Sequence, residues 1–178
     1  MKSVGIDLAT GKTGLVLLEE SGAKIPTLLS EQIVTYPELE GIERYKAICL
    51  HIMVFIHANT VPDDRIVIEG YSLNLKKASS VVPLVEVGGL LRFFLNLDGI
   101  RWLDPRATEV KKFTSGKGTT PKSMMIACVL QRWGHMSKDD NTADAYSLAC
   151  MGLAHANRLP GVTKDMRALV GGLQYRKH

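Results

Sequence analysis

The sequence predicts a mixed α/β domain, and three observations lead to that fold class. Apolar strand-like segments open the chain, amphipathic helices alternate with further strands after them, and glycine or proline residues separate the elements. The chain has 178 residues, enough for one domain with a proper core. Hydrophobic residues make up 46% and charged residues 22%, as in an ordinary soluble globular protein. We therefore expect one folded domain at 1–158 and a basic C-terminal extension at 159–178.

The N-terminal segment predicts a hairpin followed by a third strand. Residues 2–8 and 14–18 are apolar runs around a glycine-rich turn, and 27–36 mixes apolar with polar residues. An aspartate, Asp7, stands inside the first apolar strand. A buried carboxylate costs several kcal/mol unless a cation meets it. This position therefore calls for a cationic partner.

The middle of the chain predicts a helix, a strand and a second helix. Apolar residues recur at three- and four-residue steps over 38–58, which is typical of an amphipathic helix. The segment 65–69 predicts a short buried strand that ends in Glu69. Residues 78–97 predict another helix, in which Gly88-Gly89 permits close backbone approach.

The C-terminal half predicts one more strand and three more helices. The segment "IRWLDP" at 100–105 predicts a fifth strand, and proline residues open helices at 105–113 and 121–133. The last main helix begins near Asp140 and runs past His155. Beyond Pro160 the periodicity is weak, so we expect a flexible basic tail.

The distribution of charge indicates what kind of partner the protein binds, and the cysteine content indicates its cellular compartment. The net charge is +4, and lysine and arginine residues concentrate at 111–138 and 164–177. A basic patch indicates a phosphate-facing surface, although a solvated face explains the charge equally well. We interpret Cys49, Cys128 and Cys150 as reduced core thiols of a cytoplasmic protein. We expect neither a signal peptide nor a membrane span.

Three carboxylates occupy positions where the apolar pattern does not call for them. Asp7 lies within a strand, Glu69 lies at a strand end, and Asp144 interrupts an apolar helix face that it shares with Asp140. Converging carboxylates repel one another, and a divalent cation makes such a cluster favourable. Oxygen ligands suit magnesium or manganese, and two such ions could activate a water against a phosphodiester.

Each of these residues also has a plainer explanation. Asp7 could cap the following turn, Glu69 could be an exposed loop residue, and Asp140 could be the N-cap of the last helix. Asp144 lies too deep in its helix to cap it. The combination is therefore more informative than any single residue.

Four blocks of sequence resemble the RuvC-type Holliday junction resolvases of the ribonuclease H-like superfamily, particularly compact phage-encoded members. The first three blocks are "GIDLATGKTGLVLLE", "IVIEG" and "DDNTADAYSLA". The fourth, "DPRATEVKKFTSGKGTTPKSMMIACVLQRW", is the most specific. It contains Val110-Lys111, Gly116-Lys117-Gly118 and Lys122 at the family's spacing. The resemblance covers about 4–156.

The resemblance implies a fold, an activity and a set of roles. The fold is a ribonuclease H-like mixed five-stranded sheet flanked by helices. The activity is a Mg²⁺-dependent endonuclease, with Mn²⁺ as a substitute, that nicks four-way DNA junctions as a homodimer in a bacterial or phage-infected cell. Asp7, Glu69, Asp140 and Asp144 would hold two ions per site. Lys111 and Lys122 would meet the scissile phosphate or junction backbone, and Lys117 and Tyr71 would contact DNA.

The sequence departs from the family pattern at two places. Many cellular members have an aspartate where this chain has Asn141; Asp139 or Asp140 could replace it, with Asp140 favoured, or the Asn141 carbonyl could itself be a ligand. A family aromatic that helps to open the junction falls on Ser72, so that role passes to Tyr71. An ordinary packed surface ring is an equally good interpretation of Tyr71.

Other functions remain open at this point. An ATP-binding phosphotransfer module can begin with a similar hairpin, but it needs a second domain that 178 residues do not provide. A non-catalytic nucleic-acid-binding protein would carry the acidic residues at a cost. Within the nuclease class, flaps, forks and RNA are alternative substrates.

Overall fold

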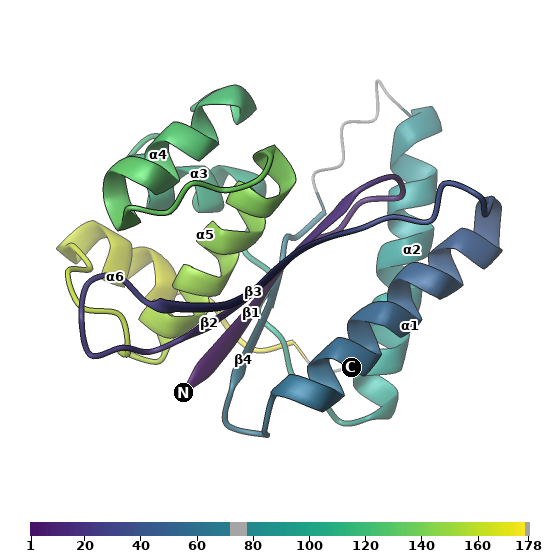
Figure 1. Cartoon of the computed structure of the whole chain (residues 1–178), viewed down its shortest axis with the longest axis horizontal. Coiled ribbons are helices and arrows are strands. Elements are labelled where there is room, and N and C mark those ends of the chain that lie inside the picture. Colours follow the sequence, from purple (N-terminus) through teal and green to yellow (C-terminus); the bar gives the residue numbers. More distant parts are fainter. Residues whose placement is uncertain (72–77, 177–178) are drawn as a thin grey trace.

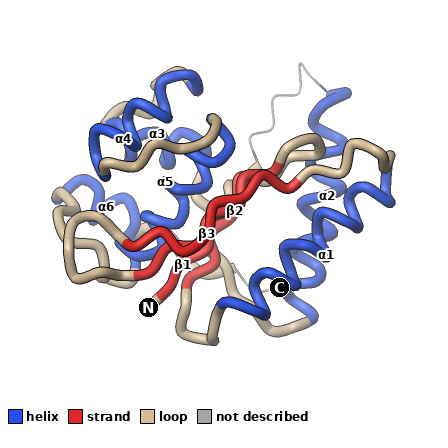
Figure 2. The backbone as a smooth tube through the Cα atoms, in the orientation of Figure 1, coloured by secondary structure: helices blue, strands red, loops and turns tan. Residues whose placement is uncertain are grey.

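The computed structural model describes residues 1–71 and 78–176, and it shows a central sheet between two layers of helices (Figure 1). In chain order the elements are β1 (Lys2–Asp7), β2 (Thr13–Glu19), β3 (Thr27–Val34), α1 (Gly41–Asn59), β4 (Arg65–Ile68), α2 (Ala78–Leu97), α3 (Ala107–Ser115), a 3-10 turn (Lys122–Met124), α4 (Met125–Trp133), α5 (Asp140–His155) and α6 (Lys164–Gly171). Helices α1 and α2 lie on one side of the sheet, and α3 to α6 lie on the other (Figure 2). The predicted mixed α/β class is confirmed.

The sheet is mixed, with strand order β3-β2-β1-β4. Strand β1 pairs antiparallel with β2 and parallel with β4. In this register Ile6 lies beside Ile68, and Asp7 lies beside Gly14. Because β1 and β4 run in the same direction, the residues at their carboxyl ends meet at one edge of the sheet.

Among the described residues the sheet has four strands, so the expected five-stranded sheet is wrong. The segment predicted as the fifth strand, 100–105, does lie along β4, where Leu103 and Val67 form an isolated parallel bridge. The N–H of Leu103 donates to Ile66 at 2.9 Å. Pro105 follows two residues later and has no N–H to donate to this neighbour, so only its carbonyl takes part, accepting from the Gly70 N–H at 2.8 Å, and no regular strand forms.

Helices α1 and α2 cover one face of the sheet because their apolar stripes match its side chains. The buried residues of α1 recur at three- and four-residue steps, as the sequence predicted. They pack with apolar residues of β1, β4 and α2 in one continuous cluster, which includes Val4, Ile6, Ile48, Ile52, Ile66, Ile68, Val87 and Leu91.

Among the helices that the structure describes, none combines the length and the hydrophobicity that a membrane span needs.

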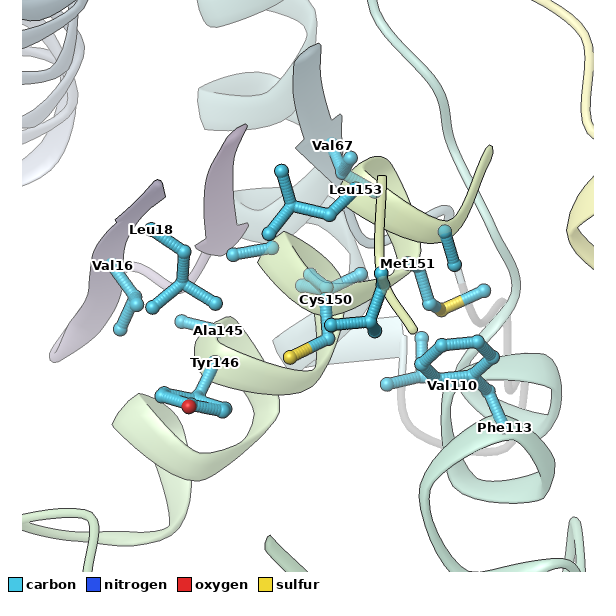
Figure 3. Packing of buried hydrophobic residues seen from close by; sticks show 14 of the residues in the cluster. Val16, Leu18, Val67, Val110, Phe113, Ala145, Tyr146, Cys150, Met151 and Leu153 are labelled. Atoms are coloured by element: carbon cyan, nitrogen blue, oxygen red, sulfur yellow. The ribbon is translucent and has the colours of Figure 1, made fainter. Parts of the chain in front are cut away.

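Helix α5 is the central helix of the other layer. Every residue from Thr142 to Ala154 is buried, so the helix is surrounded by the sheet and by α3, α4 and α6. Figure 3 shows side chains of α5 between β2 and α3. The residues seen there include Val16, Leu18, Ala145, Tyr146, Cys150, Val110 and Phe113. A helix buried on all sides is held rigidly, which matters because it carries Asp144.

The C-terminal segment is more ordered than the sequence suggested. The expectation of a flexible tail is wrong for 164–171, because α6 packs on the core through the buried Met166 and Val170. The Thr163 hydroxyl caps this helix by accepting from the Met166 N–H at 3.3 Å. The sequence did carry a short signal for this helix, because Met166, Leu169 and Val170 have the i, i+3, i+4 spacing, and the partly buried Leu169 also packs on the core. The expected domain boundary at 158/159 stays a prediction.

Candidate metal centre

Three carboxylates from three separate elements meet at the edge of the sheet. Asp7 ends β1, Glu69 directly follows β4, and Asp144 lies in the second turn of α5. The Glu69 N–H donates to the Ile6 carbonyl at 3.2 Å, which fixes the two strand ends side by side. One oxygen of each carboxylate lies within 4.8 Å of the others. The structure therefore brings together the acidic residues that the sequence singled out.

Two glycines let α5 approach the sheet closely enough to complete this group. A Cβ atom on Gly5 would lie 1.9 Å from the Ala145 carbonyl oxygen, and one on Gly14 would lie 2.2 Å from the Asn141 carbonyl oxygen. Both contacts involve helix backbone, which cannot move aside independently of the rest of α5. Only glycine at these strand positions allows the present spacing, and that spacing sets Asp144 beside Asp7.

Burial makes the three carboxylates unusually hard to ionise together. Asp7 is 8% exposed and Asp144 is 5% exposed. Burial, followed by the charge of Glu69, raises the pKa of Asp7 well above its usual value. Burial, with the charge of Asp144, raises the pKa of Glu69 to about 7. Burial also raises the pKa of Asp144 to about 6.

The ammonium group of Lys122 lies among the acidic residues. Its Nζ atom is 3.6 Å from Asp7 Oδ2, 3.6 Å from Asp140 Oδ2 and 3.8 Å from Asp144 Oδ2. It also donates a hydrogen bond of 3.0 Å to Asn141 Oδ1. Burial by itself would lower the pKa of Lys122, but the surrounding carboxylates outweigh it and raise that pKa. The charge of Lys122 in turn lowers the pKa of Asp7 and Asp144, against the effect of burial.

The donor set suits a hard divalent cation. The grouped ligand atoms are carboxylate oxygens without imidazole or thiolate, which is the chemistry that Mg²⁺ and Mn²⁺ prefer. Two buried oxygens of the group, Asp7 Oδ2 and Asp144 Oδ1, accept no hydrogen bond from the described residues. Buried acceptors of this kind are expensive unless something positive meets them. The residues present therefore fit a metal ion.

The plainer explanations for two of the aspartates do not match the observed hydrogen bonds. In the turn after β1, the hydroxyl of Thr13 accepts from the Ala9 N–H at 3.1 Å, so a threonine closes the turn. At the start of α5, Asp139 is the N-cap, and its Oδ1 accepts from the Thr142 N–H at 2.8 Å. Asp140 is thus the first helical residue. It stands outside the group of three and contacts Lys122 instead.

The remaining predicted residues lie around the centre at different depths. Lys111, on α3, is half-buried, and its charge lowers the pKa of both Glu69 and Asp144. Lys117 is exposed in the loop after α3. The Tyr71 ring lies against α2, where its hydroxyl donates to the Val85 carbonyl at 3.4 Å. Ser72 lies outside the described residues.

Sequence reasoning missed Arg92, which ties α2 to the end of β4. Its guanidinium lies over the Tyr71 ring, 4.4 Å from the centroid, and donates to the Glu69 carbonyl at 3.5 Å. A Cβ atom on Gly88 would lie 2.5 Å from the Tyr71 hydroxyl oxygen, so the ring needs a glycine beneath it. A single arginine on an otherwise apolar helix face was the available signal.

Comparisons with known proteins point to one family. No family model matches the chain. A crossover junction endodeoxyribonuclease RuvC from Carboxydothermus hydrogenoformans is 30% identical over 160 residues, which span 85% of this chain and 95% of the relative. The protein of the same name from Brachyspira hyodysenteriae is 27% identical over 158 residues, or 89% of this chain and 95% of that protein.

Solved structures agree on the fold. The Thermus thermophilus RuvC in complex with a Holliday junction substrate aligns with a TM-score of 0.69, at 21% identity, and the alignment covers 99% of each chain. A second Thermus thermophilus RuvC structure aligns with a TM-score of 0.68, at 21% identity, and covers 99% of this chain and 100% of that one. The predicted fold type is confirmed by this likeness, apart from the strand count.

Proposed function

Because the chain belongs to the RuvC family of crossover junction endodeoxyribonucleases, we propose that it resolves four-way DNA junctions by metal-dependent hydrolysis of phosphodiester bonds. Membership of this family makes the chain an endodeoxyribonuclease. The observation that carries the proposed site is the convergence of Asp7, Glu69 and Asp144 within 4.8 Å of one another. The proposed place of action is the cytoplasm of a bacterial or phage-infected cell.

We assign the metal ligands from this geometry. Asp7, Glu69 and Asp144 would hold Mg²⁺, for which Mn²⁺ could substitute, and Asp140 is the proposed further ligand for a two-ion site because it begins the same helix. When bound, such ions activate a water and stabilise the leaving oxygen of a phosphodiester. Buried strands and a buried helix hold the carboxylates in place, so little reorganisation is needed.

Basic side chains around the carboxylates give the centre its proposed grip on DNA. Lys111 and Lys122 lie close enough to influence the acidic residues, so each could also reach a phosphate held there. A cation beside the reacting phosphoryl group stabilises its developing charge. Lys117, exposed in the adjacent loop, adds salt-dependent affinity for the backbone. Tyr71 is the proposed stacking residue, worth about 1–3 kcal/mol per base.

A homodimer is the proposed assembly, and α2 offers a surface for it. Val82, Val85, Phe93 and Leu97 are exposed on this helix. Their spacing of three, eight and four residues places them close to one helical stripe. Replacing Phe93 with glutamate should shift the protein towards monomer in analytical ultracentrifugation. Replacing the equally exposed loop residue Met136 with glutamate is the matched control and should leave the assembly unchanged.

Cleavage of synthetic DNA tests the proposed activity. A four-way junction, a linear duplex and a flap are each incubated with magnesium, manganese or chelator. Wild type should make paired, metal-dependent nicks in the junction, Asp7→Asn should bind it without nicking, and the exposed Asp63→Asn should behave as wild type. Cleavage of the flap but not of the junction would keep the nuclease chemistry and assign a different branched DNA as the substrate. Junction binding without nicking in either metal would favour a non-catalytic binding protein.

A further inference from the structure

Lys122 makes its polar contacts with the same side chains that form the proposed metal centre. The Asp7 Oδ2 atom that lies 3.6 Å from the ammonium accepts no hydrogen bond from the described residues. Asp144, a second proposed ligand, lies 3.8 Å away through its Oδ2. Asp140 and Asn141 complete the surroundings from the first turn of α5. A monovalent cation of the chain itself thus stands where a divalent ion would bind.

The ammonium and a metal ion cannot share these oxygens. Both are cations, and each would lie within a few ångströms of the other in a largely buried site, where like charges repel strongly. The Lys122 side chain has somewhere to go, since it is 46% exposed and begins the short turn that precedes α4. Its flexible four-carbon stem allows the ammonium to swing without moving the backbone.

We propose that Lys122 is an exchangeable counter-ion of the metal centre. Its ammonium compensates the buried carboxylates in the metal-free protein, and it leaves them when a divalent ion binds. The released side chain then faces solvent beside the centre, where a DNA phosphate would lie. This inference rests on the proposed metal centre, and it adds that metal loading and the availability of Lys122 for DNA are coupled.

Exchange makes a specific thermodynamic prediction. If Lys122 and the metal ion compete for one set of oxygens, each weakens the other's hold by the same factor. Removing the ammonium should therefore destabilise the metal-free protein and tighten metal binding. A lysine that only supports the local structure would have the opposite effect on metal affinity, because losing it would disorder the ligands.

Thermal unfolding and calorimetry with Mg²⁺ test the exchange, both at pH 8 so that the carboxylates are ionised. Lys122→Met should lower the Tm of the metal-free protein, leave the Tm at saturating Mg²⁺ near the wild-type value, and lower the Kd for Mg²⁺ roughly tenfold, within the range of coupling between interacting sites. Lys122→Arg keeps the charge and should retain most of the metal-free stability. The exposed Lys112→Met is the matched control and should change neither quantity.

Two results would overturn the exchange while leaving the metal centre intact. One is an equal loss of Tm in Lys122→Met with and without Mg²⁺, and the other is a weaker Mg²⁺ affinity in that variant. Asp7→Asn distinguishes the proposed metal centre from the proposed exchange, because it should abolish Mg²⁺ binding whether or not Lys122 exchanges. If wild-type protein gives no Mg²⁺ binding heat and no Mg²⁺-dependent Tm shift, the proposed centre and the exchange fail together.

Discussion

Replacing Gly5 with alanine tests whether the close contact between β1 and α5 sets the geometry of the carboxylate centre. The added Cβ atom would lie 1.9 Å from the Ala145 carbonyl oxygen and 2.5 Å from the Ala149 amide nitrogen. Both atoms belong to the backbone of α5, so no side-chain rotation relieves the overlap. The helix must move away from the sheet, and Asp144 must move with it.

The size of the effect follows from these distances. Non-bonded heavy atoms rest about 3.5–4.0 Å apart, so the helix would have to shift by roughly 1.5 Å or the strand would have to bend. Overpacking of this kind costs about 1–3 kcal/mol and occasionally more. For a chain of this size, that loss corresponds to a Tm decrease of about 2–12 °C. A misplacement of about 1 Å at a reacting centre can lower the rate about a hundredfold.

Thermal unfolding, Mg²⁺ calorimetry and junction nicking together measure this perturbation. Gly5→Ala should lower the Tm, weaken Mg²⁺ binding and slow nicking. Gly11→Ala is the matched control, because a Cβ atom there meets none of the described residues within 4 Å. Wild-type Tm and Mg²⁺ affinity in Gly5→Ala would refute the idea that the glycine sets the position of Asp144.

Three further predictions concern Tyr71, the pH dependence of stability, and the contact between β3 and the loop before α5. Gly88→Ala should displace Tyr71 and weaken junction binding, which gel-shift titration measures. Gly89→Ala, where a Cβ atom meets none of the described residues within 4 Å, should instead raise helix stability by about 0.5–1 kcal/mol in thermal unfolding. The pKa of Glu69 is raised to about 7 and that of Asp144 to about 6, so the folded metal-free protein binds more protons than the unfolded chain. Its stability should therefore fall from about pH 4 to pH 7, while Mg²⁺ affinity rises. Scanning and titration calorimetry at pH 5 and pH 8 test the direction of both changes. The Glu31 side chain, which is 7% exposed, accepts a hydrogen bond from the Lys138 backbone N–H at 3.0 Å. Urea unfolding of Glu31→Ala should therefore show a stability loss of about 1–3 kcal/mol, and that of the exposed Glu38→Ala should show none.

The acidic group was predictable because a carboxylate in an apolar pattern is conspicuous within a single segment. Asp7 and Asp144 each interrupt a buried strand or helix, and the parallel pairing that joins Asp7 to Glu69 follows from the order of elements. Their role as metal ligands stays a prediction. The contact between Lys122 and Asn141 could not be read from the sequence, because it depends on how α4 docks on α5. The contacts of Arg92 with Tyr71 and Glu69 could not be read from the sequence either, because they depend on how α2 docks beside the end of β4.

The predictions of a fifth strand and of a flexible tail were wrong for a related reason. At 100–105 the residues have strand character, but pairing needs donors as well as side chains, and Pro105 withholds one. In the tail, the buried Met166 and Val170 and the partly buried Leu169 anchor α6 on the core, but their apolar pattern spans little more than one helical turn and is easily overlooked. Local patterns predict what a segment prefers, while these outcomes depend on the surface that the segment meets.

The three acidic residues lie far apart in the sequence, and this affects when the carboxylate group forms during folding. Asp7, Glu69 and Asp144 become neighbours only after β1, β4 and α5 have all docked, and contacts of such long sequence separation form late in folding. A nascent or partly unfolded chain therefore lacks the proposed divalent-ion site altogether, since no local fragment contains all three carboxylates. If the proposed centre cleaves DNA, cooperative folding itself acts as a safeguard, because a molecule that has not finished folding has no assembled centre with which to break a strand.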